Sequence, residues 1–302
     1  MFPTNAAAEQ WFIDQRWPDG IACHWCGSLD VQTGCAHKSM PFRCRSCRRR
    51  FSVRTGTVMQ SSKLGFQTWL VAMYLLTTSL KGVSSMKLHR DLGITQKSAW
   101  HLAHRLREMW RRDDPDLFAG PVEVDETYIG GKVPRMSAKR RKRFERQGPG
   151  ANKTTVVAVH DRATGQVRTR VLERVNGPFL HGFLVRHMSE DAKLYTDESS
   201  LYARIQNRET VRHKAKEFVR GDVSTNTVES FWSLLKRGYY GVFHRMSPEH
   251  LPRYLAEFEG RHNARDLDTA DQMAAMVRGA EGRRLRYDDL IGWGSRRRAR
   301  AL

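Results

Sequence analysis

Four cysteines in two pairs limit how the first 60 residues can fold. Cys23 and Cys26 stand in CHWCG, Cys44 and Cys47 stand in CRSCRRRF, and the spacing is C-x2-C-x17-C-x2-C. Each C-x2-C turn can place two sulfurs on one metal ion, and two turns complete the tetrahedron that zinc prefers. We therefore predict a small zinc ribbon over residues 1–60, with short strands near VQTG and FRC. A redox role for each pair is the competing interpretation, and the absence of a thioredoxin-type helical pattern disfavours it.

The basic excess indicates a polyanionic partner. The chain has 52 Lys and Arg against 32 Asp and Glu, a formal charge of +20, which favours nucleic acid. Arginines around the second cysteine pair, including Arg48 and Arg49, suggest phosphate contact. The sequence contains no run of about 18 apolar residues, so we expect no membrane helix. The N-terminus lacks the basic-then-apolar order of a secretory signal. We expect a cytoplasmic protein that binds double-stranded DNA and has no membrane partner.

Helical periodicity predicts a helix-turn-helix-like DNA-binding domain over residues 61–115. The apolar run FQTWLVAMYLLTTSLKG is followed by a helix that Ser84 or Ser85 can cap, and Gly93 breaks the pattern. Thr95 can cap the next helix, which would enter a DNA groove. A plain helical hairpin with a basic surface is the alternative. If the second helix is the groove reader, the residues at its start that contact bases are Gln96, Lys97 and Ser98.

The next segments predict an α/β catalytic domain over residues 121–265. In PVEVDETYIGGK, Val122 and Val124 alternate with Glu123 and Asp125, which is typical of a strand. A hairpin around DRATG, a helix in NGPFLHGFLVRHM and a strand in AKLYTDE follow. Three strands, a helix and a fourth strand form the order of an RNase H-like fold, a mixed sheet flanked by helices. Its first and fourth strands are neighbours, so Asp125 and Asp197 are expected to meet.

Two adjacent carboxylates repel each other and need a cation, and oxygen ligands suit Mg²⁺ or Mn²⁺. A third acid can come from the helix predicted in STNTVESFWSLLKRGYYG, which carries Glu229. Lys236 lies seven residues later, about two helical turns, and shares its face. The alternative for Glu229 is a capping box with Asn226, and the two roles are compatible.

Four longer motifs carry a family resemblance: VDETYIGGK, YTDESSLY, GDVSTNTVESFWSLLKRGYYGVFH and HLPRYLAEFEGRHNAR. From the ribbon at Cys23 to about Arg265, the chain resembles the DDE insertion-sequence transposases with an N-terminal zinc ribbon, the fifteen-ninety-five family. The resemblance implies terminal inverted-repeat binding, 3′-end hydrolysis and strand transfer to target DNA by two-metal chemistry. It implies Asp125, Asp197 and Glu229 as the catalytic, metal-binding triad, with Lys236 on the DNA. His213 stays outside this set.

Two further stretches of the chain are basic. The insert 131–153, with Lys139, Arg140 and Arg141, is expected to clamp DNA, and residues 266–302 are expected to form a basic tail. Because paired ends must be cut together, we expect at least a homodimer on DNA. The alternatives are a zinc-ribbon regulator without catalysis and an RNase H-like nuclease that cuts without joining.

Overall fold

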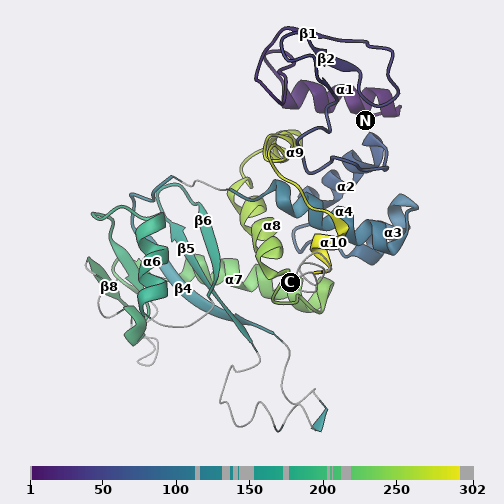
Figure 1. Cartoon of the computed structure of the whole chain (residues 1–302). Helices are drawn as coiled ribbons and strands as arrows, with labels where there is room; N and C mark the ends of the chain where they lie inside the picture. The colour runs from purple at the N-terminus through teal and green to yellow at the C-terminus, as the bar shows by residue number, and fades with distance from the viewer. Residues whose placement is uncertain are drawn as a thin grey trace, which may run out of the picture. The chain divides into compact units, whose positions relative to one another are not determined.

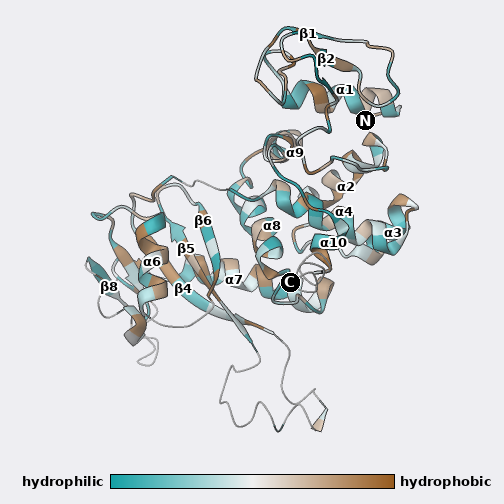
Figure 2. Cartoon of the chain, viewed as in Figure 1, coloured by the Kyte–Doolittle hydropathy of each residue, from teal (hydrophilic) through white to brown (hydrophobic). Residues whose placement is uncertain are grey.

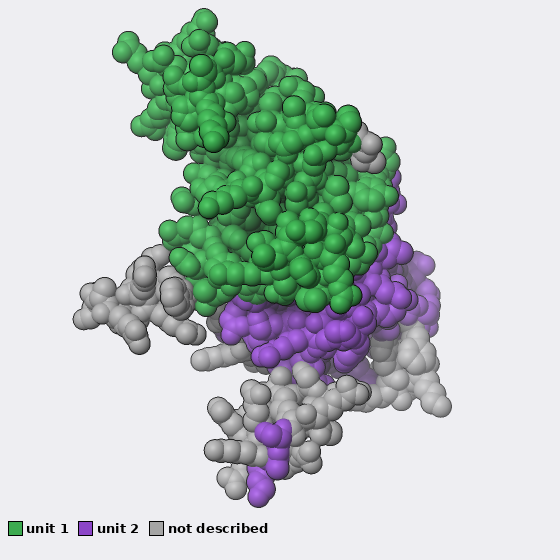
Figure 3. Space-filling view, turned by 90° about the vertical axis from the view of Figure 1, so that its right-hand side faces the viewer, with its two compact units in different colours: residues 1–79, 83–111, 267–302 green, residues 80–82, 112–266 purple. Residues whose placement is uncertain are grey.

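A computed structural model describes residues 2–112, 116–130, 137, 138, 142, 153–172, 177–202, 205, 207–211 and 219–292 (Figure 1). The chain divides into two compact units, coloured separately in Figure 3. Unit 1 comprises residues 1–79, 83–111 and 267–302, and unit 2 comprises residues 80–82 and 112–266. The two units are described separately below.

Unit 1 begins with a helix and a small antiparallel sheet. Helix α1 (Asn5–Arg16) was not predicted, and the Thr4 hydroxyl caps it by accepting from the Ala7 N–H. The sheet has the order β1-β2-β3, with β1 at Val31–Gln32, β2 at Phe42–Cys44 and β3 at Arg50–Phe51. The short strands predicted near VQTG and FRC are therefore confirmed. A small core holds this sheet, formed by Cys23, Phe42, Cys44 and Phe51, with Trp17 against it.

The predicted helices and the glycine turn of unit 1 are confirmed. Helix α2 spans Phe66–Thr78, α3 spans Ser85–Leu92 and α4 spans Gln96–Met109. The hydroxyls of Ser84 and Thr95 cap α3 and α4. Gly93 ends α3 with φ 62°, a left-handed conformation that glycine adopts without a steric penalty.

The described part of the range expected as a basic tail contains α9 (Thr269–Arg278) and α10 (Tyr287–Leu290). Helix α9 contacts α1, α2 and α4 and buries Met273, Met276 and Val277. Arg16 at the end of α1 forms two hydrogen bonds of 2.9 and 2.7 Å with the Glu281 carboxylate. Residues near the end of the chain therefore belong to the same packed unit as the beginning.

Unit 2 is built on a mixed sheet. Its strands are β4 (Val122–Ile129), β5 (Thr154–Asp161), β6 (Val167–Leu172), β7 (Leu194–Thr196) and β8 (Arg208–Thr210), in the order β6-β5-β4-β7-β8. Strands β4, β5 and β6 pair antiparallel, whereas β7 pairs parallel with β4 and with β8. The predicted adjacency of the first and fourth strands is confirmed. Strand β8, and the β9 (Val219–Arg220) and β10 (Val223–Ser224) pair, were not predicted.

Helices cover both faces of this sheet. Helix α6 (Gly177–His187) packs on Val122, Val124, Val157 and Val159, and Figure 2 shows the apolar residues of α6, β4 and β5. Helices α7 (Asn226–Gly238) and α8 (Leu251–Asn263) pack on the opposite face. Trp232 and Leu235 of α7, and Tyr239 of the π-helical turn that follows it, are buried there. None of the helices within the described residues is long and apolar enough to cross a membrane.

Helix α8 also satisfies the outer edge of β6. The Asn263 amide accepts from the Val167 N–H at 2.7 Å and donates to the Val167 carbonyl at 2.9 Å. The Glu259 carboxylate accepts from the Thr169 N–H at 2.8 Å and from its hydroxyl at 2.9 Å. Backbone groups of an edge strand are thus bonded to side chains of the same chain.

Candidate active site and metal-binding cysteines

Asp125 and Asp197 stand on neighbouring strands of the unit 2 sheet. Asp125 lies within β4, and Asp197 follows the last residue of β7. The parallel register pairs Val122 with Leu194 and Glu123 with Tyr195. Continued for two more residues, this register brings Asp197 level with Asp125. The strand predicted in AKLYTDE ends at Thr196, one residue before Asp197.

The electrostatic environment of Asp125 shows which groups surround it. The pKa of its carboxyl is raised to about 6: burial is the largest cause and the negative charges of Asp197 and Glu229 act in the same direction, whereas a backbone hydrogen bond from Glu126 and the charge of Lys236 lower it. A carboxyl group feels such effects only from charges that are close by in space. The four residues that the sequence grouped are therefore neighbours in unit 2.

Glu229 and Lys236 come from α7. Glu229 lies in the first turn of the helix, and the Thr225 hydroxyl donates to its carboxylate at 2.9 Å.

In the part of the chain that the structure describes, only the four cysteines form a set of three or more potential ligands within 4.8 Å of one another. The three carboxylates are thus grouped more loosely than the cysteines.

Glu123 is a site residue that the sequence did not predict. Its side chain is fully buried, and one carboxylate oxygen accepts from the backbone N–H groups of Thr227 at 2.9 Å and Val228 at 3.0 Å. These are donors of the first turn of α7, which the helix itself leaves unbonded. A carboxylate of β4 therefore caps the helix that carries Glu229, two positions before Asp125.

Arg162 also binds Glu123, and we call the contacts of Glu123 with α7 and Arg162 the Glu123 joint. Its Nε donates to the other oxygen of Glu123 at 2.7 Å, and its terminal nitrogens donate to the carbonyl of Asp222 and to Ser224. Its guanidinium also lies 4.8 Å from the centre of the Tyr195 ring. One arginine after β5 thus links β4, β7 and β10 next to the acidic residues.

Asn226 is not the N-cap residue that the alternative interpretation of Glu229, a capping box, requires. Helix α7 begins at Asn226 and its N-cap residue is Thr225, which makes no side-chain cap hydrogen bond. At this end of the helix, Glu123 accepts from the N–H groups of Thr227 and Val228. The Glu229 carboxylate accepts from the Thr225 hydroxyl.

A second carboxylate, Glu126, lies beside the acidic group. Its pKa is raised to about 7: burial is the largest cause and the charges of Asp125 and Asp197 act in the same direction, whereas the hydrogen bond from the Tyr202 hydroxyl lowers it. Arg208 of β8 donates to the Asp197 carbonyl at 3.0 Å and to the Thr196 hydroxyl at 2.9 Å. The acid next to Asp125 in VDET is the sequence signal of this wider cluster, whereas the contacts of Arg208 depend on strand β8, which was not predicted.

The four paired cysteines of unit 1 form a compact sulfur cluster. The sulfurs of Cys23 and Cys47 are 3.6 Å apart, and those of Cys26 and Cys44 are also 3.6 Å apart. All four sulfur atoms lie within 4.8 Å of one another. Such spacing fits four thiolates around one tetrahedral ion with metal–sulfur bonds of about 2.3 Å. The Cys35 sulfur instead lies 3.8 Å from the Gln32 carbonyl. The cluster is a possible metal site, and its all-sulfur donor set suits zinc.

The predicted DNA-contacting residues lie on several parts of the chain. Gln96 and Lys97 are exposed; Gln96 donates to the Ser85 hydroxyl at 3.1 Å, and the Lys97 ammonium lies 4.2 Å from the centre of the Tyr287 ring. On the ribbon, Arg49 lies 5.0 Å from the centre of the exposed Trp25 ring. Arg48, beside it, has φ 61°. Four positions lie outside the described residues: Lys139, Arg140, Arg141 and His213.

Comparisons with known proteins agree with this arrangement. Residues 118–263, which contain the acidic residues, match the family described as the ISXO2-like transposase domain. A protein of Halobacterium salinarum, described as an uncharacterized protein in transposable element ISH50, is 28% identical over 275 residues. That similarity covers 86% of this chain and 91% of the archaeal one.

Proposed function

Since the chain belongs to the insertion-sequence transposases of the fifteen-ninety-five type, with their ISXO2-like domain, we propose that it is a DDE-class DNA transposase. In this proposal it binds the terminal inverted repeats of its insertion sequence, hydrolyses the 3′ ends and transfers them to target DNA. The observation that carries the proposal is the shared environment of Asp125, Asp197, Glu229 and Lys236.

The fold proposed for unit 2 is RNase H-like. The order of three antiparallel strands, a helix and a parallel strand beside the first supports it. So does the position of Asp125 within the first strand and of Asp197 after the fourth. In this fold the sheet places the two acids, and α7 brings Glu229 to them.

The residues that hold the catalytic Mg²⁺ or Mn²⁺ are proposed to be Asp125, Asp197 and Glu229. Their fit to a hard cation rests on the donor set, which is all carboxylate oxygen, and on the mutual repulsion that raises the pKa of Asp125. Bound divalent ions supply activation of the attacking oxygen and neutralisation of charge on the leaving oxygen. We likewise propose that the cysteine cluster holds a structural Zn²⁺, because thiolates suit zinc.

The reaction needs no protein nucleophile. In the first step water attacks the phosphodiester at the end of the element, and the bond to the 3′ oxygen breaks, which leaves a 3′-hydroxyl. In the second step this hydroxyl attacks a target phosphodiester, so one phosphorus–oxygen bond forms as another breaks. The exposed ammonium of Lys236 contacts the DNA backbone beside the reacting phosphate, where its positive charge opposes the phosphate charge.

Recognition of the DNA is assigned to unit 1 and to the basic insert 131–153. Gln96, Lys97 and Ser98 at the start of α4 read the inverted repeat, and Arg48 and Arg49 of the ribbon bind phosphates. The insert with Lys139, Arg140 and Arg141 clamps the duplex. Because two element ends are processed together, the acting species is a homodimer or larger, working on DNA in the cytoplasm.

The test is strand cleavage and joining in vitro. The full chain is incubated with a labelled inverted-repeat duplex, target plasmid and Mg²⁺ or Mn²⁺, and both 3′-end cleavage and joined products are measured. We expect activity from the wild type and from the control Glu198→Gln, and none above background from Asp125→Asn, Asp197→Asn or Glu229→Gln. Full activity in any of these three variants would remove that residue from the triad. Cleavage without joining would indicate a nuclease, and binding without cleavage a regulator.

A further inference from the structure

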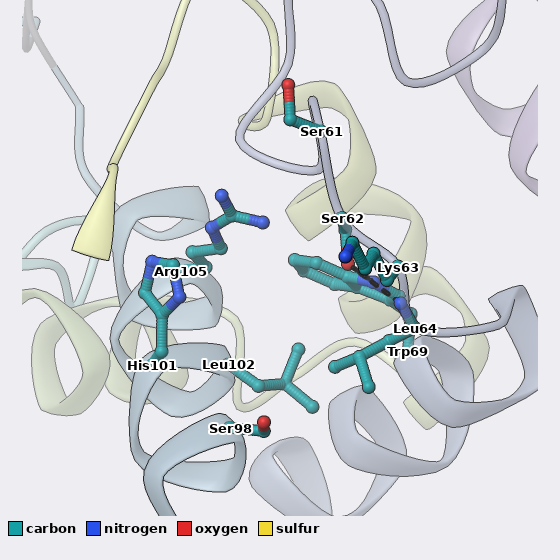
Figure 4. Close-up of a pocket in the computed structure, with 9 residues that line it drawn as sticks. All are labelled: Ser61, Ser62, Lys63, Leu64, Trp69, Ser98, His101, Leu102 and Arg105. Atoms are coloured by element: carbon teal, nitrogen blue, oxygen red, sulfur yellow. Dashed lines mark hydrogen bonds between the residues drawn. The ribbon is translucent and has the colours of Figure 1, made fainter.

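A polar cavity of about 170 Å³ lies in unit 1 between α2, α4 and the loop that precedes α2 (Figure 4). Its lining combines cationic and hydroxyl side chains with an apolar floor and contains no acidic residue. The lining residues are Ser61, Ser62, Lys63, Leu64, Trp69, Ser98, His101, Leu102 and Arg105.

The positive charge of this cavity is only partly neutralised. Arg105 is buried, and its guanidinium donates to the carbonyls of Leu285 at 3.0 Å and Gln60 at 3.4 Å, which uses two of its five N–H groups. Burial lowers the pKa of Arg105, and the positive charges of Arg284 and Arg54 lower it further. Figure 4 shows the Arg105 and His101 side chains extending from α4 toward the cavity.

A second arginine, which is partly buried, holds the loop in place. Arg54 donates to the carbonyl of Ser62 at 2.6 Å and to that of Leu64 at 2.8 Å, so a guanidinium lies behind the loop that forms one wall. The acid near Arg54 is Glu9, which does not line the cavity. The loop therefore presents Lys63 beside fixed positive charge.

Two serine hydroxyls of the cavity, those of Ser62 and Ser98, can act as donors. The Ser62 hydroxyl oxygen accepts from the Trp69 indole N–H at 3.2 Å, and the Ser98 hydroxyl oxygen accepts from the Thr95 hydroxyl at 2.9 Å. With an oxygen lone pair used in each case, each hydroxyl hydrogen can be given to another acceptor. Together with Lys63 and Arg105, these groups match a ligand that has several acceptor oxygens, negative charge and no donor.

We propose that this cavity binds a phosphate group, and that its occupant is a backbone phosphate of the DNA held by unit 1. The identity of the occupant rests on the function proposed above. Ser98 lies in the first turn of α4, next to the exposed Gln96 and Lys97. A DNA strand that passes the start of α4 therefore runs past the cavity, whose rim is formed by the exposed Ser61 and Lys63.

The first experiment measures anion binding by the full chain without DNA. Inorganic phosphate is titrated into the protein at constant ionic strength, with chloride as the reference, and the thermal midpoint is recorded. We expect phosphate to raise the midpoint of the wild type and of Lys63→Arg. The increase should be lost in Lys63→Gln and reduced in Ser98→Ala. Lys38→Gln, which changes an exposed ribbon lysine outside the cavity, is the matched control and should respond as the wild type does.

The second experiment measures affinity for an inverted-repeat duplex as a function of salt. Each phosphate contact adds about 0.9 to the slope of log K against log salt concentration. Lys63→Gln should therefore lower the slope by about one and weaken specific and non-specific duplexes alike, and Lys63→Arg should restore both. An unchanged slope together with a retained phosphate response in Lys63→Gln would overturn the site.

The two experiments separate failure of the site from failure of the proposed function. A phosphate response that depends on Lys63, with an unchanged DNA slope, would overturn the DNA backbone as the occupant. If the wild type does not bind inverted-repeat DNA at all, the proposed function fails, and DNA is likewise overturned as the occupant. The phosphate titration then still decides whether the cavity is an anion site.

Discussion

Glu123 shows how a single buried side chain can position the acidic site. Its carboxylate receives two N–H groups of α7 and the Nε–H of Arg162, so it joins a strand, a helix and a loop. Helix α7 carries Glu229 three positions after its first residue, and β4 carries Asp125 two positions after Glu123. The relative position of the two site acids therefore depends on this joint.

Replacing Glu123 by glutamine tests this joint. The variant keeps the shape of the side chain but loses the charge that Arg162 and the helix N-terminus require, so we expect a loss of about 2–4 kcal/mol in the free energy of unfolding. Strand cleavage should fall as well, because Glu229 loses its fixed position. Urea unfolding and the cleavage assay measure the two effects. Glu190→Gln, an exposed acid of the same unit, is the control. Unchanged stability in Glu123→Gln would show that the joint contributes little.

The raised pKa of Asp125 predicts that the free energy of unfolding of the metal-free protein falls as the pH rises. Its folded pKa of about 6 is above the ordinary value of 3.8, so the folded state binds its proton more tightly than the unfolded state does. Stability is therefore lost as the pH rises from about 4 to about 6, by about 1–3 kcal/mol. In chelator at pH 7.5, Asp125→Asn should melt a few degrees above the wild type.

The same comparison at pH 4.5 and with Mg²⁺ completes the test. The advantage of Asp125→Asn should shrink at pH 4.5, since Asp125 is then protonated in the folded wild type. Mg²⁺ should raise the melting temperature of the wild type more than that of the variant. Equal melting temperatures of both proteins in chelator at pH 7.5 would contradict the assigned environment of Asp125.

At the level of elements, the ribbon depends on its sulfur cluster. The strands β1, β2 and β3 are two or three residues long, and their small core includes two of the cysteines. Such an element is held mainly by its metal. We expect about one zinc per chain after purification without chelator, a loss of zinc in Cys26→Ser, and loss of near-ultraviolet circular dichroism from the ribbon aromatics. Cys35→Ser should keep the zinc. Zinc-free wild-type protein with an intact ribbon spectrum would refute the site.

Sequence patterns predicted those elements whose signals are local. The caps Ser84 and Thr95, the turn at Gly93 and the alternation of β4 each depend on residues a few positions apart. The hydrogen-bond partners of Glu123 include Arg162 and Thr227, which lie 39 and 104 positions away, and no local sequence pattern predicts them. The same holds for β8, whose three residues become a strand through pairing with β7. Residue types led to the prediction that Asp125, Asp197 and Glu229 act together, whereas the contacts of Glu123 are seen only in the folded chain.

At the level of the whole molecule, the beginning and the end of the described chain stabilise each other. Helix α9 buries side chains against α1, α2 and α4, and Arg16 binds Glu281. A chain that stops at Asp266 should lose on the order of several kcal/mol from unit 1, because burial of each large apolar side chain contributes about 1.5–3 kcal/mol. Thermal unfolding and limited proteolysis of unit 1 test this. A chain that stops after Gly292 keeps these contacts and serves as the control. Equal stability of both truncated chains would contradict the prediction.

The covered edge of β6 has a consequence for how copies of the chain can assemble. An exposed edge strand is a template on which another chain can add a strand. Here Asn263 and Glu259 already occupy the outward-facing groups of Val167 and Thr169. A second copy cannot extend the sheet at these residues without displacing α8. Assembly of several copies must therefore use other surfaces, and the sheet of unit 2 is protected from fibre-like self-association along this edge.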